Sequence, residues 1–169
     1  ADAFDAWRAG GLKVWKDRVR GLWPATAGLL DGIPESEGPA LASYVDVTLS
    51  PTIGDRLVVI GDAAHATSPQ LGQGANLALA DALFLARSFE AADDIPTALA
   101  DFQRTRRRHV LFYQRASRWL TPFFQSDSRL AGALRDWTFG PSGRIGFVRQ
   151  QMVEMLCGIK TGPVGRLDP

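Results

Sequence analysis

The sequence predicts an α/β fold class that is mostly helical in this chain, with few strands. Two observations favour this class: an aliphatic run at 56–60 stops at Gly61, and a Leu/Ala-rich helical pattern follows Asn76. A third observation is that the sequence shows five or six helical segments but only one or two clear strands. Open α/β sheets bind ligands in loops that follow strand ends, so the loop over 61–76 is the expected ligand site.

The first half of the chain predicts two helices and then two strands. Residues 2–31 alternate charged and apolar side chains at helical spacing, with a break at Gly10 and Gly11, and Pro24 ends or restarts the second helix. The segment 33–40 is a loop by composition. Residues 41–50 alternate as a half-buried strand, and after a turn over 51–55 the run at 56–60 predicts a more deeply buried strand.

The second half predicts helices only. A buried helix is expected over 75–89, and Pro96 suits the first turn of a long helix that reaches Leu120. The stretch "TPFFQSDS" interrupts it, and shorter helices follow over 127–137 and 143–157, the last closed by Gly158. One or two strands cannot cover the edges of a sheet, so strands are expected to be missing from this chain.

Composition excludes several classes of protein. The 169 residues are 46% apolar and carry a net charge of +1, which gives no reason to expect nucleic acid or an anionic membrane as a partner. No signal peptide and no apolar run of about 20 residues are visible. Cys157, the single cysteine, is expected to be a buried thiol, and its lack of a partner favours a reducing, cytoplasmic location. No metal site is predicted, because Asp62 and His65 would lack a third ligand.

The loop over 61–76 fails several familiar patterns. A P-loop would need lysine and a hydroxyl where Ala75 and Asn76 stand, and the dinucleotide fingerprint would need glycine at Leu77. A hydrolase elbow, G-x-S-x-G, is absent. What remains is a carboxylate at a strand end and a helix N-terminus behind two glycines. This pair suits a ligand with hydroxyls and a group that becomes negative.

These residues resemble a known family. The block "GDAAHATSPQLGQGANLALADA" closely resembles the second flavin-binding motif of the aromatic-hydroxylase type (group A) of FAD-dependent monooxygenase. The downstream "RHVLFYQRASRWLTPFFQSDS" and "LCGIKTG" resemble the C-terminal helical region of its bacterial members. The resemblance implies the C-terminal part of an FAD-binding Rossmann-like monooxygenase fold. It also implies hydroxylation of a small aromatic or polycyclic substrate with NAD(P)H and O2.

The resemblance assigns roles to individual positions. Asp62 would bind a ribityl hydroxyl of FAD, and Gly61 would give clearance at the strand end. The pyrimidine edge of the flavin, which is anionic when reduced, would face the start of the following helix. Pro69 would place its backbone carbonyl, the one catalytic candidate, where oxygen and substrate meet. The expected cofactor-binding residues are Gly61, Asp62, Pro69, Gly72, Gly74, Ala75 and Asn76, of which Asn76 either caps the helix or touches the ring.

The family's N-terminal G-x-G-x-x-G unit does not occur in this sequence. The chain is therefore expected to be the C-terminal part of such an enzyme, inactive alone and a weak binder of FAD. Residues 1–52 would come from the substrate-binding layer, and 53–169 from the end of the FAD domain plus a helical tail. The options for assembly are a homodimer or association with a missing N-terminal segment.

Other interpretations stay open. His65 is expected to be a hydrogen-bonded structural residue rather than a catalytic base, and the arginines at 104 and 106–108 a solvated helix face. Trp119, Phe123 and Phe124 suit a core or an interface. The chain as a whole could instead be a non-catalytic helical interaction module that uses its "LTPFF" surface. A further alternative is a non-hydroxylating FAD oxidoreductase of the same fold.

Overall fold

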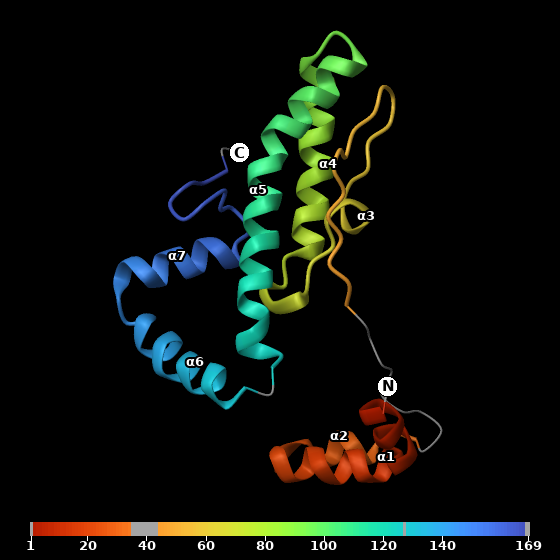
Figure 1. Cartoon of the computed structure of the whole chain (residues 1–169), viewed down its shortest axis with the longest axis vertical. Helices are drawn as coiled ribbons and strands as arrows, with labels where there is room; N and C mark the ends of the chain where they lie inside the picture. The colour runs from red at the N-terminus through yellow and green to blue at the C-terminus, as the bar shows by residue number, and fades with distance from the viewer. Residues whose placement is uncertain (1, 35–43, 127, 168–169) are drawn as a thin grey trace. The chain divides into compact units, whose positions relative to one another are not determined.

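The computed structural model describes residues 2–34, 44–126 and 128–167. The chain divides into two compact units, Ala1–Ser43 and Tyr44–Pro169 (Figure 1). The division falls before the expected boundary at 52/53, so the segment 44–52 belongs to the same unit as the loop over 61–76. The roles expected for the two parts stay predictions.

The first unit contains a kinked helix and two short ones. Helix α1 (Asp2–Leu22) is interrupted at Gly11, whose φ of 72° and ψ of 171° lie outside the helical region. The predicted break between two helices is therefore confirmed at Gly11. Pro24 opens the 3-10 helix η1 (Pro24–Thr26), which leads into α2 (Ala27–Asp31). Lys16 Nζ donates to the carbonyl of Ile33 at 2.7 Å and so ties the end of this unit back to α1.

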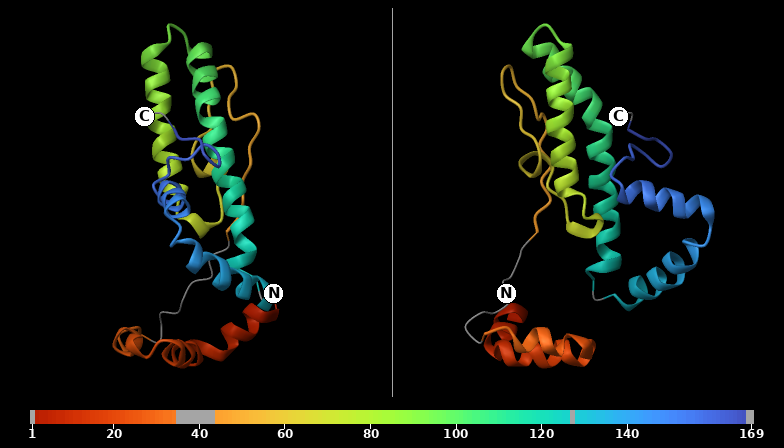
Figure 2. Two further views of the ribbon diagram at one scale, coloured as in Figure 1. Left: turned by 90° about the vertical axis from the view of Figure 1, so that its left-hand side faces the viewer. Right: turned by 180° about the vertical axis from the view of Figure 1, so that it is seen from behind.

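The second unit is built on a pair of long helices. Helices α4 (Gly74–Ala91) and α5 (Ile95–Phe124) lie side by side, as both views of Figure 2 show. Asp94 caps α5 by accepting from the amide of Thr97 at 2.7 Å. The shorter elements are α3 (Asp62–His65), η2 (Pro69–Leu71), α6 (Arg129–Ser142) and α7 (Gly146–Leu156). The buried apolar side chains of this unit include Ala64, Leu77, Ala98, Leu99, Phe102 and Tyr113.

The predicted helices are found, with one correction. Helix α4 begins at Gly74, one residue before the expected helix over 75–89, and Gly158, at φ 76°, follows the end of α7 as expected. The interruption predicted at the start of "TPFFQSDS" is wrong, because α5 runs through Pro122 to Phe124. A proline so near the end of a helix removes only one backbone hydrogen bond from the last turns. Ser128 then caps α6 by accepting from the amide of Ala131.

The two predicted strands are not found among the described residues, which show only isolated bridges, Ile53 with Val58 and Lys160 with Arg166. The described part of the first segment, 44–50, is extended and bonds to the chain around α3, with the amide of Val47 donating to the carbonyl of Ala66 at 2.9 Å. A strand needs a paired neighbour along its length, and within the described residues 57–60 pairs only with the short segment 52–54, where the amide of Gly54 donates to the carbonyl of Leu57 and the amide of Val59 to the carbonyl of Thr52, both at 2.8 Å. The mostly helical character is confirmed, whereas no Rossmann-like sheet occurs in the described ranges.

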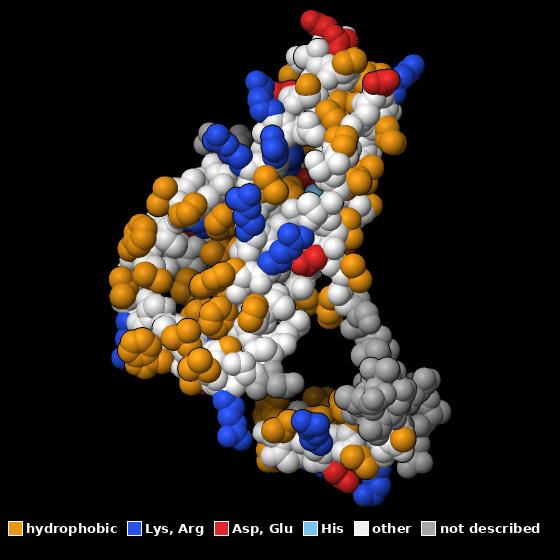
Figure 3. Space-filling view, viewed as in Figure 1, with side chains coloured by type: hydrophobic (Ala, Val, Ile, Leu, Met, Phe, Trp, Pro, Cys, Tyr) orange, Lys and Arg blue, Asp and Glu red, His pale blue; other side chains and the backbone are white. Residues whose placement is uncertain are grey.

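Apolar side chains gather on the surface over α6 and α7 (Figure 3). Cys157 is exposed beside this surface, so the expectation of a buried thiol is wrong. Trp119 and Phe124 are also exposed, which excludes a core role for them within this unit. None of the described helices has the length and apolar character required to cross a bilayer.

Candidate functional site

The Asp62 carboxylate lies beside the start of α4. A Cβ atom built on Gly74 would stand 3.5 Å from Asp62 Oδ1, although twelve residues separate the two positions. Asp62 is exposed, and within the described ranges its side chain makes no hydrogen bond. The structure therefore brings together the two groups that the sequence singled out, a free carboxylate and a helix N-terminus.

Gly61 is a position that only glycine fits. Its φ of 62° lies in the left-handed region, and an added Cβ would stand 3.2 Å from the Cβ of Ala78 on α4. Its amide donates to Asp81 Oδ2 at 2.9 Å. The turn before Asp62 is thus held against α4 by close packing and by one buried hydrogen bond.

The N-terminus of α4 is open. Gln73 occupies the N-cap and makes no side-chain capping bond, while Gly72 adopts a left-handed φ of 62° with open space around it. Ala75 is exposed on the first turn. Unpaired amides of a first turn carry the positive end of the helix dipole, which favours a negatively charged group. Asn76 does not cap the helix, because its Nδ2 donates to Gln73 Oε1 at 3.1 Å.

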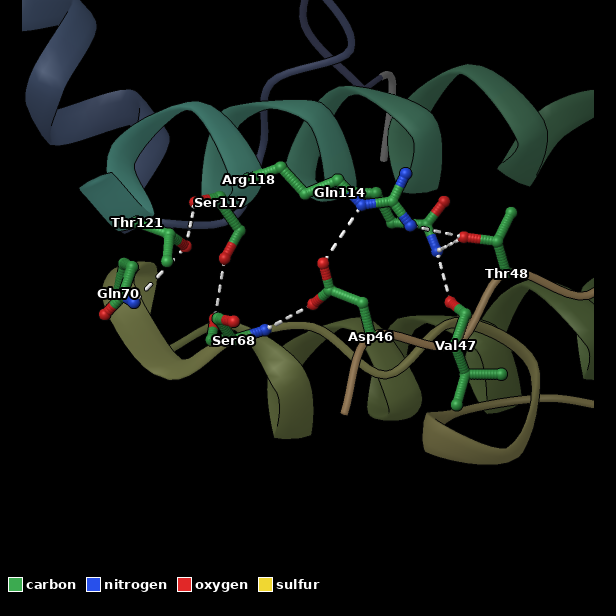
Figure 4. Close-up of polar contacts among 9 residues, drawn as sticks. All are labelled: Asp46, Val47, Thr48, Ser68, Gln70, Gln114, Ser117, Arg118 and Thr121. Carbon is green, nitrogen blue, oxygen red and sulfur yellow. Dashed lines mark hydrogen bonds and ion pairs between the residues drawn. The ribbon is translucent and has the colours of Figure 1, made fainter. Parts of the chain in front are cut away.

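The loop that carries Pro69 is held by α5 (Figure 4). Pro69 opens η2, and its carbonyl accepts from the amide of Gly72 at 3.0 Å. Ser117 Oγ donates to the carbonyl of Ser68 at 2.7 Å, and Gln70 Nε2 donates to Thr121 Oγ1 at 3.3 Å. Side chains one turn apart on α5 therefore fix both flanks of Pro69.

The extended segment before the loop is held by the same face of α5. Arg118 pairs with Asp46 at 3.0 Å and also donates to Thr48 Oγ1 at 2.7 Å (Figure 4). Asp46 in turn accepts from the amide of Ser68 at 3.0 Å, and Gln114 Nε2 donates to the carbonyl of Val47 at 2.7 Å. Sequence reasoning missed this face. The signal was present as polar residues at helical spacing, at 114, 117, 118 and 121.

A buried polar cluster lies behind the loop. Asp81, on α4, accepts from His65 Nε2 at 2.6 Å and from Arg106 Nε at 2.8 Å. Arg106 also donates to the carbonyl of Leu77 at 3.2 Å and to His109 Nδ1. Asp81 and Arg106 are 2% and 3% exposed. The cluster joins α3, α4 and α5, and a cavity beside it is lined by His65, Asp81 and Arg106 but not by Asp62.

Hydrogen bonding decides the charges of this cluster. Burial acts to raise the pKa of Asp81, but the bonds from His65, Gly61 and Arg106 prevail and hold that pKa below its usual range. Burial and the neighbouring Arg106 lower the pKa of His109 to about 4. His109 is therefore neutral at pH 7, with Nδ1 accepting from Arg106 and Nε2 donating to the carbonyl of Gly158 at 2.7 Å.

Two expectations about these residues are resolved. His65 is a hydrogen-bonded residue as expected, and its partner is Asp81, sixteen positions further along the chain. The solvated helix face expected for the arginine run is wrong for Arg106. Arg106 follows Phe102 by four positions and precedes Tyr113 by seven, so helical spacing places it on the buried face. The other arginines of the run, 104, 107 and 108, are exposed.

The segment after α7 is seated against the start of α4. Gln73 Nε2 donates to the carbonyl of Leu156 at 2.8 Å, and Tyr113 bonds both the carbonyl of Met155 and the amide of Lys160. A Cβ on Gly158 would stand 2.7 Å from Gln73 Oε1. The "LCGIKTG" stretch therefore braces the side of α4 that carries Gln73 and Asn76.

The donor set fits a ligand of the predicted kind. An unpaired, exposed carboxylate suits hydroxyl groups, and an uncapped helix start with glycine on both sides of Gln73 lets an anionic group approach the backbone. Among the described residues no three His, Cys, Asp or Glu side chains lie close enough to bind a metal ion.

Known proteins that resemble this chain include FAD-dependent ones. Residues 14–111 match the model of the FAD binding domain family. A putative 2-heptyl-3-hydroxy-4(1H)-quinolone synthase of Rhodococcus erythropolis is 36% identical over 98 residues, which are 58% of this chain and 25% of that protein. An FAD-dependent monooxygenase of Aspergillus terreus is 31% identical over 135 residues, 77% of this chain and 30% of that protein. A kynurenine 3-monooxygenase of Salinispora tropica is 47% identical over 56 residues, 33% of this chain and 12% of that protein.

The chain thus spans less than a third of the length of these relatives. No solved structure matches it. The family match covers more than half of the chain and includes the whole loop over 61–76. This chain belongs to the FAD binding domain family, and it is similar to proteins named as FAD-dependent monooxygenases.

Proposed function

We propose that the chain forms the flavin-end binding site of an FAD-dependent monooxygenase that hydroxylates a small aromatic or polycyclic substrate with NAD(P)H and O2. The observation that carries the proposal is the Asp62 carboxylate beside the uncapped start of α4. The relatives named as a putative quinolone synthase and as a kynurenine 3-monooxygenase support the substrate class. When bound, FAD supplies the redox and oxygen chemistry.

The residues of this chain then bind and orient the cofactor. Asp62 accepts hydrogen bonds from ribityl hydroxyls, and Gly61 leaves room for the close approach. The backbone at Gly72, Gly74 and Ala75 presents the positive end of α4 to the edge of the ring that becomes negative on reduction. In this proposal Asn76 lies next to the flavin ring, and its side chain donates a hydrogen bond to Gln73.

The Pro69 loop faces the substrate side in this proposal. One lone pair of its carbonyl is used by the amide of Gly72, so the second is free to accept from a substrate group. The contacts of Ser117 and Thr121 hold the flanking residues in place, which supports a fixed position for this carbonyl. Positioning of this kind is the contribution that a protein makes to cofactor chemistry.

The Asp62→Ala variant of the full-length enzyme tests the proposal. Loss of a carboxylate that pairs ligand hydroxyls is expected to weaken FAD binding by about 1–3 kcal/mol, roughly 5- to 150-fold in Kd. Flavin fluorescence titration of the apoenzyme measures it. Asp55→Ala, which removes an exposed aspartate outside the loop, is the matched control. Equal affinity in the Asp62 variant and the wild type would contradict the assignment, and a colourless full-length protein would favour the interaction module.

A further inference from the structure

We propose that Asp81 is a positioning residue for the flavin site, one that fixes the turn carrying Asp62 and does not itself contact the cofactor. The inference rests on the function proposed above and adds to it a second layer of residues, His65 and Arg106, which hold Asp81 in turn. Three features of the structure carry it.

The first feature is that Asp81 holds α3 at both ends. Its Oδ2 atom accepts from the amide of Gly61 at 2.9 Å, directly before the helix, and from Nε2 of His65 at 2.6 Å, at the last residue of the helix. Asp62 is the first residue of this single turn. A four-residue helix has almost no stability of its own. The position of Asp62 is therefore set by bonds from outside the helix, which are these two to Asp81 and the bonds that the amides of Leu49 and Val47 donate to the carbonyls of Ala64 and Ala66.

The second feature is that Asp81 belongs to the helix whose N-terminus forms the other half of the site. Gly74 and Asp81 are seven residues apart on α4, about 10 Å along a rigid helix. Gly61, directly before Asp62, also packs closely against Ala78 of the same helix. The residues that anchor the Asp62 turn and the open amides of α4 therefore belong to the same rigid helix, which favours a fixed spacing between the two halves of the site.

The third feature is the charge balance that keeps Asp81 ionised. Asp81 is almost fully buried, and burial alone would favour its neutral form. Arg106 occupies Oδ1 at 2.8 Å and also donates to the carbonyl of Leu77, which locks α5 to α4 at this level. With Oδ1 committed to Arg106, Oδ2 is left for the two bonds to α3.

Asp81 does not extend to the loop surface that carries Asp62, because its side chain is 2% exposed and both of its carboxylate oxygens are already bonded, to Gly61 and His65 and to Arg106. Its effect on FAD must therefore pass through the position of Asp62. This separates it from a general core residue, since removal of a core residue weakens binding whether or not Asp62 is present.

A double-mutant cycle in the full-length enzyme tests the proposal, with FAD affinity measured by flavin fluorescence titration of the apoenzyme. Asp81→Asn is expected to weaken FAD binding about 5- to 20-fold when Asp62 is present and less than about twofold in the Asp62→Ala background. Asp101→Asn, which alters an aspartate bonded to Ser88 and Arg104 away from the site, is the control and should leave the affinity unchanged. The flavin absorption spectrum should shift with Asp81→Asn and not with the control.

The outcomes are distinct. An equal loss of affinity in both backgrounds would overturn the proposal and make Asp81 a general stabilising residue. If Asp62→Ala alone leaves FAD binding unchanged, the proposed function itself fails. Should Asp81→Asn not fold, His65→Gln goes through the same cycle, because it loosens only the far end of α3 and keeps the bond from Gly61 to Asp81. A smaller loss of affinity confined to the background that retains Asp62 is then expected.

Discussion

Replacement of Arg106 by methionine should strongly destabilise the unit formed by α3, α4 and α5. Methionine keeps much of the arginine's volume and removes its charge. Asp81, 2% exposed, then loses its cation and one of its three hydrogen-bond donors. The carbonyl of Leu77 and Nδ1 of His109 lose a donor as well. Removing one partner of a buried ion pair typically costs about 3–5 kcal/mol, a large share of the roughly 5–15 kcal/mol that holds a domain folded.

Urea unfolding of the full-length enzyme, followed by circular dichroism, measures this loss. Arg104→Met is the matched control, because Arg104 lies on the same helix and pairs with Asp101 while its side chain is 80% exposed. An exposed pair of this kind contributes no more than about 1 kcal/mol. A loss below about 1 kcal/mol for Arg106→Met, equal to that of the control, would refute the reasoning, because it would mean that water reaches Asp81 and replaces the guanidinium.

Two further predictions concern the residues that seat the C-terminal segment. The pKa of His109 is about 4 in the folded chain and 6.5 ordinarily, so the unfolded chain binds more protons between these values. The free energy of unfolding should therefore fall by about 1–3 kcal/mol as the pH drops from 6.5 to 4, after allowance for screening. Urea unfolding at several pH values measures this dependence, and the His109→Gln variant should show a smaller slope. An unchanged slope in the variant would contradict the prediction. Gly158→Ala should cost at least about 1–2 kcal/mol, because Gly158 has a left-handed φ and an added Cβ would also stand 2.7 Å from Gln73 Oε1. Gly132→Ala, inside α6 with open space around it, should instead stabilise by about 0.5–1 kcal/mol. Thermal unfolding compares the two, and equal shifts would be the contrary result.

The sequence alone was sufficient for features that depend on near neighbours along the chain. The start of α4 at Gly74, Pro96 in the first turn of α5 and the end of α7 just before Gly158 all follow from local φ/ψ preference. The loop motif was long enough to identify the family. Such features are readable because the groups that satisfy each other lie within a few residues.

The strand predictions failed for the opposite reason. The aliphatic pattern at 56–60 reports burial preference, but a strand exists only when another segment supplies its hydrogen bonds. Cys157 shows the same limit, since its apolar neighbours in sequence do not determine what packs over it. In both cases the missing information is the identity of the neighbour in space.

The second layer of the site was decided by tertiary structure. Nothing local in the sequence joins Asp81 to His65, sixteen residues before it, or to Arg106, twenty-five residues after it. Helical spacing could have placed Arg106 on the buried face, yet which acid it would meet depends on how α4 and α5 pack. The sequence thus singled out the residues that are proposed to bind the cofactor, because that chemistry resides in single side chains and local backbone. Tertiary packing determined what holds them in place, because a buried charge is stable only where partners from distant segments converge on it.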